Sequence, residues 1–284
     1  MEADIKLLSG DSIHICEVGT GRPTIILVHG LTGSHKQMVH YQTVLSEDYH
    51  VISYDLRGRG KSSSANSQPS IDAHVGDLID LIMTLNLESV VLVGYSFGAY
   101  ICTKVAAMCE QVLSLVLLDG AGVPDDGQLD LLSPQLNRMK KIYNSESDYF
   151  NESQQVYQWL KVQWSPMLEE ATQYEVEETD FGWRHRSKSY MMMKDFRSCF
   201  DFDYQKILPN IHVPVLLVKA TGRLGNGRPF YLYEAYTELE KTTRDLEVMA
   251  TEANHFSLVL ERQEMVNQFM INFLERKVQK ALEK

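Results

Sequence analysis

Short apolar runs recur along the chain and are separated by segments that carry more polar residues. Each run is four or five residues long, which is typical of a strand that is covered on both faces of a mostly parallel sheet. The runs lie at residues 24–28, 51–54, 90–93, 115–118, 215–218 and 246–249. Before the first run, residues 5–8 and 12–18 flank Ser-Gly-Asp, and this pattern predicts a hairpin.

Between the apolar runs lie segments whose apolar residues are spaced three and four apart. Residues 71–83 and the closing segment 264–274 show this spacing most clearly, and it predicts amphipathic helices. Strand and helix signals that alternate in this way favour βαβ units. The sequence therefore predicts an α/β fold with a doubly wound, mostly parallel β-sheet.

Residues 122–206 interrupt the alternation. They contain no apolar run of strand type and are rich in Gln, Glu, Met and Tyr. A structureless loop of this length is uncommon inside a compact domain, so we expect a helical cap inserted between two strands. The core is then formed by residues 1–121 and 207–284. Some aromatic residues of the cap and the run 191–193 of methionines are candidates for an apolar substrate pocket, although core packing is the expectation for most of them.

Charge and cysteine content exclude several classes of protein. The chain of 284 residues has 27 Lys and Arg against 38 Asp and Glu, a net charge of −11, which opposes binding to nucleic acid or to anionic membranes. The N-terminal residues lack the pattern of a signal peptide and no run is long enough to span a membrane, so we expect a cytoplasmic protein. The four cysteines have no CxxC spacing, and we expect neither a disulfide nor a metal site. No cofactor is predicted, and the oligomeric state stays open.

The sequence Gly94-Tyr-Ser-Phe-Gly98 lies between the apolar run 90–93 and a helical segment. It matches the G-x-S-x-G nucleophile elbow, a tight strand-to-helix turn that raises a serine hydroxyl above the sheet. Small residues on both sides of Ser96 allow the strand and the helix to approach each other. The pattern is short, but here it stands in the strand-to-helix context that the mechanism needs.

A second motif, His29-Gly30, ends the run 24–28. A glycine at this point lets the following loop fold close to the nucleophile. In enzymes with this elbow, an oxyanion hole is formed by the amide after the nucleophile and by an amide of this loop. The candidates are the backbone N–H groups of Phe97 and Leu31.

With these motifs the chain resembles the α/β-hydrolase family whose members carry a cap. The supporting motifs are His29-Gly30, the turn Asp-Leu-Arg-Gly-Arg-Gly-Lys-Ser at 55–62, Gly-Tyr-Ser-Phe-Gly-Ala at 94–99 and Asn-His-Phe at 254–256. They occur in the order of the family and span nearly all of the predicted core. In the family's turn, Asp55 organises the loop together with Arg57.

The resemblance implies a histidine near the C-terminus that accepts the serine proton and returns it to the leaving group. His255 matches this histidine because it follows the last predicted strand. His29 belongs to the His-Gly turn, where a structural role or support of the oxyanion loop is expected. The histidines at 14, 35, 40, 50, 74 and 212 have no comparable context, and surface or core positions are expected for them.

The sequence departs from the family in the position of its acid. The commonest acid follows the strand at 213–220, but the first carboxylate after that strand is Glu234. Some members place the acid after the strand that follows the nucleophile helix, and Asp119 matches that position. Asp125 and Asp126 are the alternatives, and it stays open whether Asp119 only bonds nearby amides and the site lacks an acid.

The resemblance implies a serine hydrolase that acts on an ester, a thioester or a lactone of a small molecule through an acyl-enzyme, of the carboxylesterase or lactonase type. A second hypothesis is the hydrolysis of a carbon–carbon bond in a diketone, with Arg184-His-Arg186 binding a carboxylate of the substrate. A solvated helix face is the alternative for this charged cluster. A third hypothesis is a ligand-binding protein that has kept the fold and lost turnover.

Overall fold

The computed structural model describes residues 1–63 and 69–279, and its main element is an eight-stranded sheet with the order β1-β2-β4-β3-β5-β6-β10-β11. Pairing is antiparallel between β1 and β2 and between β2 and β4, and parallel between all the other neighbours. The strands are β1 (Glu2–Lys6), β2 (Ser12–Val18), β3 (Thr24–Val28), β4 (His50–Tyr54), β5 (Val90–Tyr95), β6 (Val112–Leu118), β10 (Val215–Gly222) and β11 (Leu246–Asn254). The predicted hairpin and the mostly parallel sheet are confirmed, although the first strand of the hairpin is Glu2–Lys6 and not residues 5–8.

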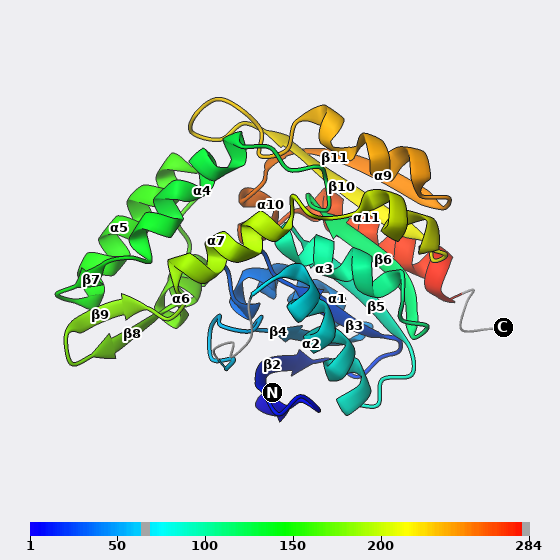
Figure 1. The fold of residues 1–284 in the computed structure, drawn as a ribbon, viewed down its shortest axis with the longest axis horizontal. Coiled ribbons are helices and arrows are strands. Elements are labelled where there is room, and N and C mark those ends of the chain that lie inside the picture. The colour runs from blue at the N-terminus through cyan, green and yellow to red at the C-terminus, as the bar shows by residue number, and fades with distance from the viewer. Residues whose placement is uncertain (64–68, 280–284) are drawn as a thin grey trace.

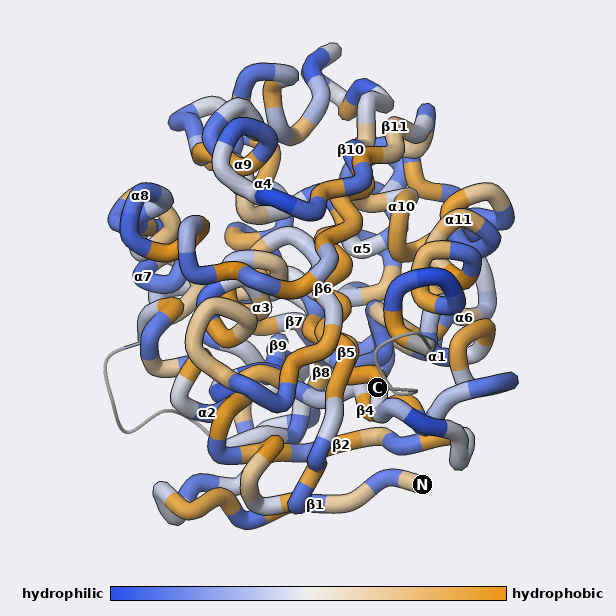
Figure 2. The backbone as a smooth tube through the Cα atoms, turned by 90° about the vertical axis from the view of Figure 1, so that its right-hand side faces the viewer, coloured by the Kyte–Doolittle hydropathy of each residue, from blue (hydrophilic) through white to orange (hydrophobic). Residues whose placement is uncertain are grey.

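Helices cover both faces of this sheet, so the doubly wound arrangement is also confirmed. Figure 2 shows α2 (Ile71–Thr84) and α3 (Phe97–Ala106) on one side of the strands, and α1 (Val39–Leu45) and α11 (Glu264–Leu274) on the other. The central strands β3 and β5 are buried along their whole length. Their burial explains why their sequences are uninterrupted apolar runs, because both faces of each strand pack under helices.

Several strands are longer than their apolar runs, and β10 and β11 extend furthest at their carboxyl ends. β10 continues to Gly222 and β11 to Asn254, with a register shift between Ala220 and Gly222. The backbones of β10 and β11 remain paired there, and residues of β11 are polar and partly exposed because β11 is an edge strand. Hydrophobic periodicity cannot detect such an extension, since no apolar face is buried by it.

The segment predicted to be the cap, residues 122–206, lies between β6 and β10, and its elements α4 to α7 are at the left of Figure 1. Its helices are α4 (Gly127–Arg138), α5 (Glu146–Trp159), α6 (Pro166–Tyr174) and α7 (Ser189–Ser198). Besides these helices, the segment contains strands that the sequence pattern did not indicate. Three short strands, β7 (Ile142–Tyr143), β8 (Val176–Thr179) and β9 (Gly182–His185), form an antiparallel sheet in the order β7-β9-β8. They have two to four residues each and no apolar run, so the sequence pattern did not reveal them.

The remaining elements are short. They are α8 (Tyr204–Ile207), α9 (Thr237–Thr242), α10 (Ser257–Leu260), the 3-10 helices η1 (His35–Met38), η2 (Leu208–Asn210) and η3 (Tyr233–Tyr236), and the π-helical η4 (Glu275–Gln279). Within the described ranges, no helix combines the length and the apolar character that crossing a membrane requires. All four cysteines are free.

Candidate active site

The turn between β5 and α3 places Ser96 in a backbone conformation that side chains rarely adopt. Its φ is 52° and its ψ is −115°, a strained combination that persists only when the surroundings enforce it. A Cβ atom at Gly94 would lie 2.6 Å from the carbonyl oxygen of Gly98, and one at Gly98 would overlap the carbonyl oxygens of Val28 and His29. The two glycines therefore allow the strand and the helix to pack closely enough to form the turn.

Ser96, His255 and Asp119 are joined by two hydrogen bonds. The Nε2 atom of His255 lies 3.0 Å from Oγ of Ser96, and its Nδ1 atom lies 2.7 Å from Oδ2 of Asp119. Asp119 follows β6 and His255 follows β11, so both residues lie at the carboxyl end of the parallel strands, beside the turn that holds Ser96. The exposed fractions are 7% for Ser96, 2% for His255 and 0% for Asp119. The structure thus brings together the three residues that the sequence analysis singled out.

The carboxylate of Asp119 is held by two further donors. Its Oδ1 atom accepts hydrogen bonds from the amide of Ala220, at 2.9 Å, and from the hydroxyl of Tyr236, at 2.8 Å. Asp119 therefore bonds a nearby amide, as it would if its role were only structural. Its second oxygen, Oδ2, is directed at His255. This arrangement fixes the carboxylate and leaves it to orient the imidazole.

The two alternative acids lie elsewhere. Asp125 accepts hydrogen bonds from Arg228 at 2.8 and 2.6 Å, and these bonds lower its pKa although partial burial acts against them. Asp126 is exposed at the start of α4. Neither carboxylate is hydrogen-bonded to His255 in the described structure.

The imidazole of His255 is enclosed by aromatic side chains. The ring of Phe230 stacks on it with the centroids 3.7 Å apart and the planes 8° from parallel, and the hydroxyl of Tyr95 donates to the carbonyl of His255 at 2.9 Å. Burial lowers the pKa of His255, and the hydrogen bond to Asp119 opposes this change. The ring is therefore neutral near pH 7, with Nδ1 donating to Asp119 and Nε2 available to accept a proton from Ser96. Phe230 could not be predicted as a site residue, because no local sequence pattern connects it with a histidine that follows another strand.

The residues predicted for the oxyanion hole, Leu31 and Phe97, line the same cavity as Ser96. Phe97 is the first residue of α3, and amides in the first turn of a helix have no acceptor within that helix. The carbonyl of Leu31 accepts from Nε of Arg59 at 3.2 Å, and the amide of Gly30 donates to Gln37 at 2.9 Å. These contacts hold the loop beside the nucleophile.

His29 has the structural role expected for it. Its Nδ1 atom donates to the carbonyl of Gly30 at 2.7 Å, and its Nε2 atom accepts from the amide of Leu56 at 3.0 Å. Burial lowers the pKa of His29 to about 3, so the ring stays neutral. His29 therefore connects the oxyanion loop to the turn that follows β4.

Asp55 organises that turn, but not in the way predicted. It accepts from the backbone and side-chain nitrogens of His35, at 2.8 and 2.9 Å, and from the hydroxyl of Tyr174 at 2.6 Å. Burial acts to raise the pKa of Asp55, but the hydrogen bonds from His35 and Tyr174 outweigh it and lower the pKa to about 2. Arg57, the expected partner, forms ion pairs with Asp77 and Asp11.

The cavity at Ser96 is small and almost closed by the cap. Its open volume is about 20 Å³, room for about one water molecule. Its lining comes from the core and from the cap helices α4 and α7: Leu31, Ser96, Phe97, Tyr100, Pro124, Gln128, Leu132, Phe196, Cys199, Phe230 and Tyr231. The cap residues considered as pocket candidates, including the methionines at 191–193, do not belong to this lining. Several of them pack inside the cap, as Tyr157 does against Trp164.

The cluster Arg184-His185-Arg186 does not contribute to this cavity either. Arg184 and His185 lie on β9, so they form part of a strand and not of a helix face. Both arginines form ion pairs with Glu177, at 2.9 and 3.0 Å. The cluster lines a separate cavity of the cap and is not among the residues that surround Ser96.

One buried network was not foreseen from the sequence. Nη2 of Arg59 lies 2.6 Å from Oδ2 of Asp195, and Nε2 of His74 lies 3.2 Å from the same oxygen. Burial acts to raise the pKa of Asp195, but the charge of Arg59 and the bond from His74 lower it. Because Asp195 belongs to α7, this network ties the cap to the loop that carries Leu31.

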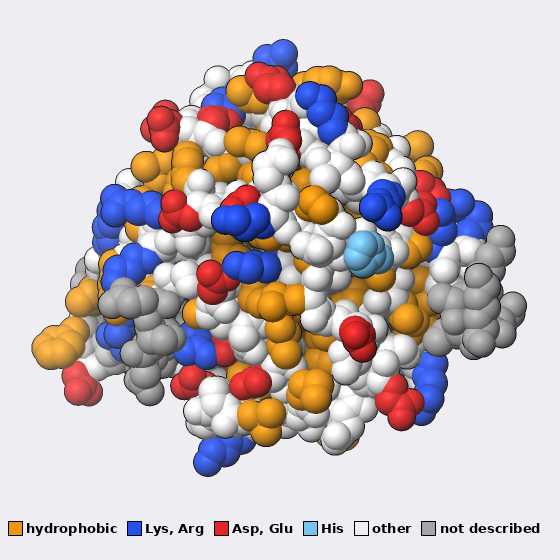
Figure 3. All heavy atoms as spheres, turned by 45° about the vertical axis from the view of Figure 1, so that its right-hand side comes forward, with side chains coloured by type: hydrophobic (Ala, Val, Ile, Leu, Met, Phe, Trp, Pro, Cys, Tyr) orange, Lys and Arg blue, Asp and Glu red, His pale blue; other side chains and the backbone are white. Residues whose placement is uncertain are grey.

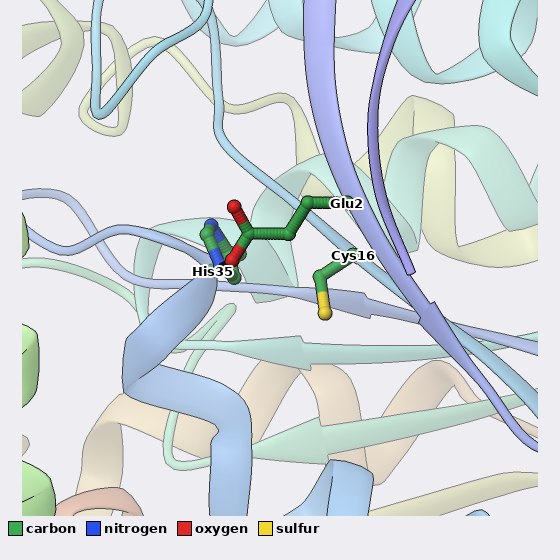
Figure 4. A group of neighbouring side chains, drawn as sticks. All are labelled: Glu2, Cys16 and His35. Carbon is green, nitrogen blue, oxygen red and sulfur yellow. Dashed lines mark ion pairs between the residues drawn. The ribbon is translucent and has the colours of Figure 1, made fainter.

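Glu2, Cys16 and His35 form the group that comes nearest to a metal site among the described residues. Their donor atoms all lie within 4.8 Å of one another. Figure 4 shows the three side chains close together. The carboxylate of Glu2, however, pairs with Lys36 at 3.4 Å and Lys61 at 3.3 Å. Partial burial acts to raise the pKa of Glu2, but these two lysines lower it to about 2. The adjacent positive charges oppose a cation here, so we assign the group to ion pairs that hold the N-terminal hairpin on the core.

The chain belongs to the α/β-hydrolase fold family, whose profile matches residues 23–258. A solved E-2-(acetamidomethylene)succinate hydrolase superposes with a TM-score of 0.84 at 21% identity, over 97% of this chain and 99% of that chain. An esterase from Exiguobacterium antarcticum superposes with a TM-score of 0.72 at 19% identity, over 97% of this chain and all of that chain. At these identities the two structures show the shared fold.

Curated relatives match over shorter segments. A provisionally named esterase/lipase of Haemophilus influenzae is 30% identical over 123 residues, which are 43% of this chain and 42% of that protein. The (E)-2-((N-methylformamido)methylene)succinate hydrolase of Acinetobacter baylyi is 33% identical over 102 residues, 36% of this chain and 38% of that protein. The chain therefore matches less than half the length of these two relatives.

Proposed function

We propose that the protein is a serine hydrolase that cleaves a carboxylic ester, a thioester or a lactone of a small molecule through an acyl-enzyme. The observation that supports the proposal is the pair of hydrogen bonds that link Ser96, His255 and Asp119, at 3.0 and 2.7 Å. The strained turn at Ser96 and the neutral imidazole of His255 fit the same role.

In the first half of the reaction, Oγ of Ser96 attacks the carbonyl carbon while Nε2 of His255 accepts the hydroxyl proton. Asp119 keeps the Nδ1 proton in place and stabilises the imidazolium. The amides of Leu31 and Phe97 donate to the developing oxyanion. When the tetrahedral intermediate collapses, His255 gives its proton to the leaving alcohol or thiol, and the acyl group remains on Ser96.

In the second half, a water molecule takes the place of the leaving group. His255 accepts a proton from this water as it attacks the acyl carbonyl, and the second tetrahedral intermediate is held by the same two amides. Its collapse returns the proton to Ser96 and releases the carboxylic acid. Each transferred proton passes through Nε2 of His255, and the other proton of the water leaves with the carboxylic acid.

The cavity lining favours an uncharged group at the scissile carbonyl. Among the described residues, no Lys or Arg lines it, and its walls are mainly apolar side chains such as Leu132 and Phe196. The relative from Acinetobacter baylyi is named for a succinate, which carries two carboxylates. Because no cation of the described chain lines the cavity here, an ester or thioester with a small apolar acyl group fits better than a dicarboxylate or the acidic diketone of the second hypothesis.

The proposal is tested by hydrolysis of matched esters, thioesters and lactones that share a short acyl group. Wild-type protein is compared with Ser96→Ala and with Asp119→Asn. We expect hydrolysis by the wild-type protein, no hydrolysis above the uncatalysed rate with Ser96→Ala, and a rate about 10²- to 10⁴-fold lower with Asp119→Asn. Wild-type protein that binds these compounds without turnover would instead be a ligand-binding protein.

A further inference from the structure

A second cavity of the cap, which we call the basic groove, differs from the rest of this acidic chain. Its volume is about 760 Å³, and its described lining contains seven Lys or Arg residues and no Asp or Glu. The whole chain has a net charge of −11, and on the face shown in Figure 3 basic and acidic side chains are interspersed. A cavity lined by one sign of charge raises the local concentration of ligands of the opposite sign.

Neighbouring carboxylates neutralise only part of this charge. Lys141 pairs with Glu152 at 2.8 Å, and the two arginines at 184 and 186 share Glu177. Lys188 and Arg197 are exposed at the groove and form no ion pair with any carboxylate of the described chain. Uncompensated positive charge therefore faces the groove.

The groove also exposes apolar side chains. Ile142 and Tyr190 line it, and each is 60% exposed to solvent. Apolar and cationic side chains in one concave site suit an organic ligand that carries an anionic group, because the organic part covers the apolar side chains while the anion meets Lys and Arg.

The cap helices connect this groove with the cavity at Ser96. On α7, Phe196 lines the Ser96 cavity, and the next residue, Arg197, lines the groove, so the two cavities lie on neighbouring faces of this helix. α4 packs beside α7 and repeats the arrangement, with Leu132 at the cavity and the residue after the helix, Met139, at the groove.

We propose that the basic groove binds a phosphate group on the alcohol or thiol half of the substrate, while the ester or thioester carbonyl of the same molecule reaches Ser96. This inference rests on the proposed hydrolase function. Lys and Arg recognise phosphate by charge-assisted hydrogen bonds. The acyl group lies at Ser96, and the leaving group passes between α4 and α7, which line both cavities, to place its phosphate in the groove. The substrate class is therefore a phosphorylated ester or thioester.

The first experiment compares two thioesters of the same short acyl group, one of coenzyme A and one of N-acetylcysteamine, which lacks phosphate. The variant is Lys188→Gln combined with Arg197→Gln. Its control is Lys6→Gln combined with Arg244→Gln, two exposed cations outside the groove. We expect wild-type protein to prefer the coenzyme A thioester in kcat/KM, the groove variant to lose about 10- to 100-fold of this preference, and the control to keep it.

A binding measurement separates a failure of this inference from a failure of the hydrolase proposal. Coenzyme A is titrated calorimetrically into Ser96→Ala with and without the two groove substitutions, so no turnover is needed. A dissociation constant at least tenfold higher in the groove variant supports the site even if no thioester is hydrolysed. Equal dissociation constants, or binding only to phosphatidylglycerol vesicles and not to coenzyme A, would overturn it.

Discussion

Arg59 and Asp195 form an ion pair that is buried between the core and the cap, with Nη2 and Oδ2 2.6 Å apart and exposed fractions of 1% and 0%. Arg59 also donates to the carbonyl of Leu31, and its guanidinium lies 5.8 Å from the centre of the Phe97 ring. One side chain therefore contacts both residues whose amides are proposed to bind the oxyanion. Because Asp195 belongs to α7, the closed cap supplies the charge that holds Arg59 in this position.

Asp195→Asn is expected to lower the free energy of unfolding by about 3–5 kcal/mol, because it leaves the charge of Arg59 buried without its counterion. Urea unfolding measures this loss. Asp203→Asn removes an exposed ion pair with Lys206 and is the control, for which we expect no measurable change. If Asp195→Asn and Asp203→Asn lowered the free energy of unfolding by the same amount, the buried ion pair would not stabilise the closed cap.

Replacement of Gly98 by Ala is expected to destabilise the protein and to abolish activity. The added methyl group overlaps the backbone oxygens of Val28 and His29, so the turn that presents Ser96 has to shift. Such overpacking costs about 1–3 kcal/mol or more. Gly76 lies on α2 with open space around it, so Gly76→Ala should stabilise the protein by about 0.5–1 kcal/mol. Thermal unfolding and ester hydrolysis of both variants test the contrast, and a fully active Gly98→Ala protein would contradict it.

The pH dependence of hydrolysis follows from the lowered pKa of His255. The imidazole must be neutral to accept the serine proton, so kcat/KM should rise with pH and reach a plateau above this pKa. Burial lowers the pKa from its ordinary value of 6.5, so the midpoint should lie below 6.5. Asp119→Asn removes the negative charge that opposes the lowering of the His255 pKa. In this variant the midpoint of the kcat/KM profile should therefore move to lower pH, and the value of kcat/KM on the plateau should fall. A wild-type midpoint above 6.5 would contradict this account.

Phe230→Ala is expected to open the face of His255 to water, because Phe230 stacks directly on this ring at 3.7 Å. With less burial, the pKa of His255 should rise towards its ordinary value, and the midpoint of the kcat/KM profile should shift to higher pH. Phe181, which is 83% exposed, offers the control Phe181→Ala. Identical profiles for the two variants would show that the stacking does not set the pKa.

The sequence predicted those parts of the molecule whose signals are local. The runs that became β3 and β5 are apolar because both faces are buried, and the two glycines around Ser96 are required by backbone contacts within one turn. Asp119 could be found because it ends an apolar run, although its choice over Asp125 and Asp126 depended on a family resemblance. The bonds of Asp119 to Ala220 and Tyr236 had no sequence signal.

The parts that escaped prediction depend on contacts between distant segments. Arg59 lies in a turn motif, whereas its partner Asp195 lies in a cap helix, and no periodicity relates the two. Phe230 lies in a loop after β10 and meets His255 only in the folded protein. The basic groove likewise combines residues from the end of α4, from β9 and from α7, so it becomes visible only when these elements are placed together.

The central claim is that Ser96 is a nucleophile activated by His255 and Asp119. The most direct measurement is the mass of the protein after reaction with a fluorophosphonate, with Ser96→Ala and Asp119→Asn treated in parallel. The account predicts a single adduct on Ser96 of the wild-type protein, no adduct in Ser96→Ala, and labelling slowed by about 10²–10⁴-fold in Asp119→Asn. A wild-type protein that stays unlabelled would contradict the account.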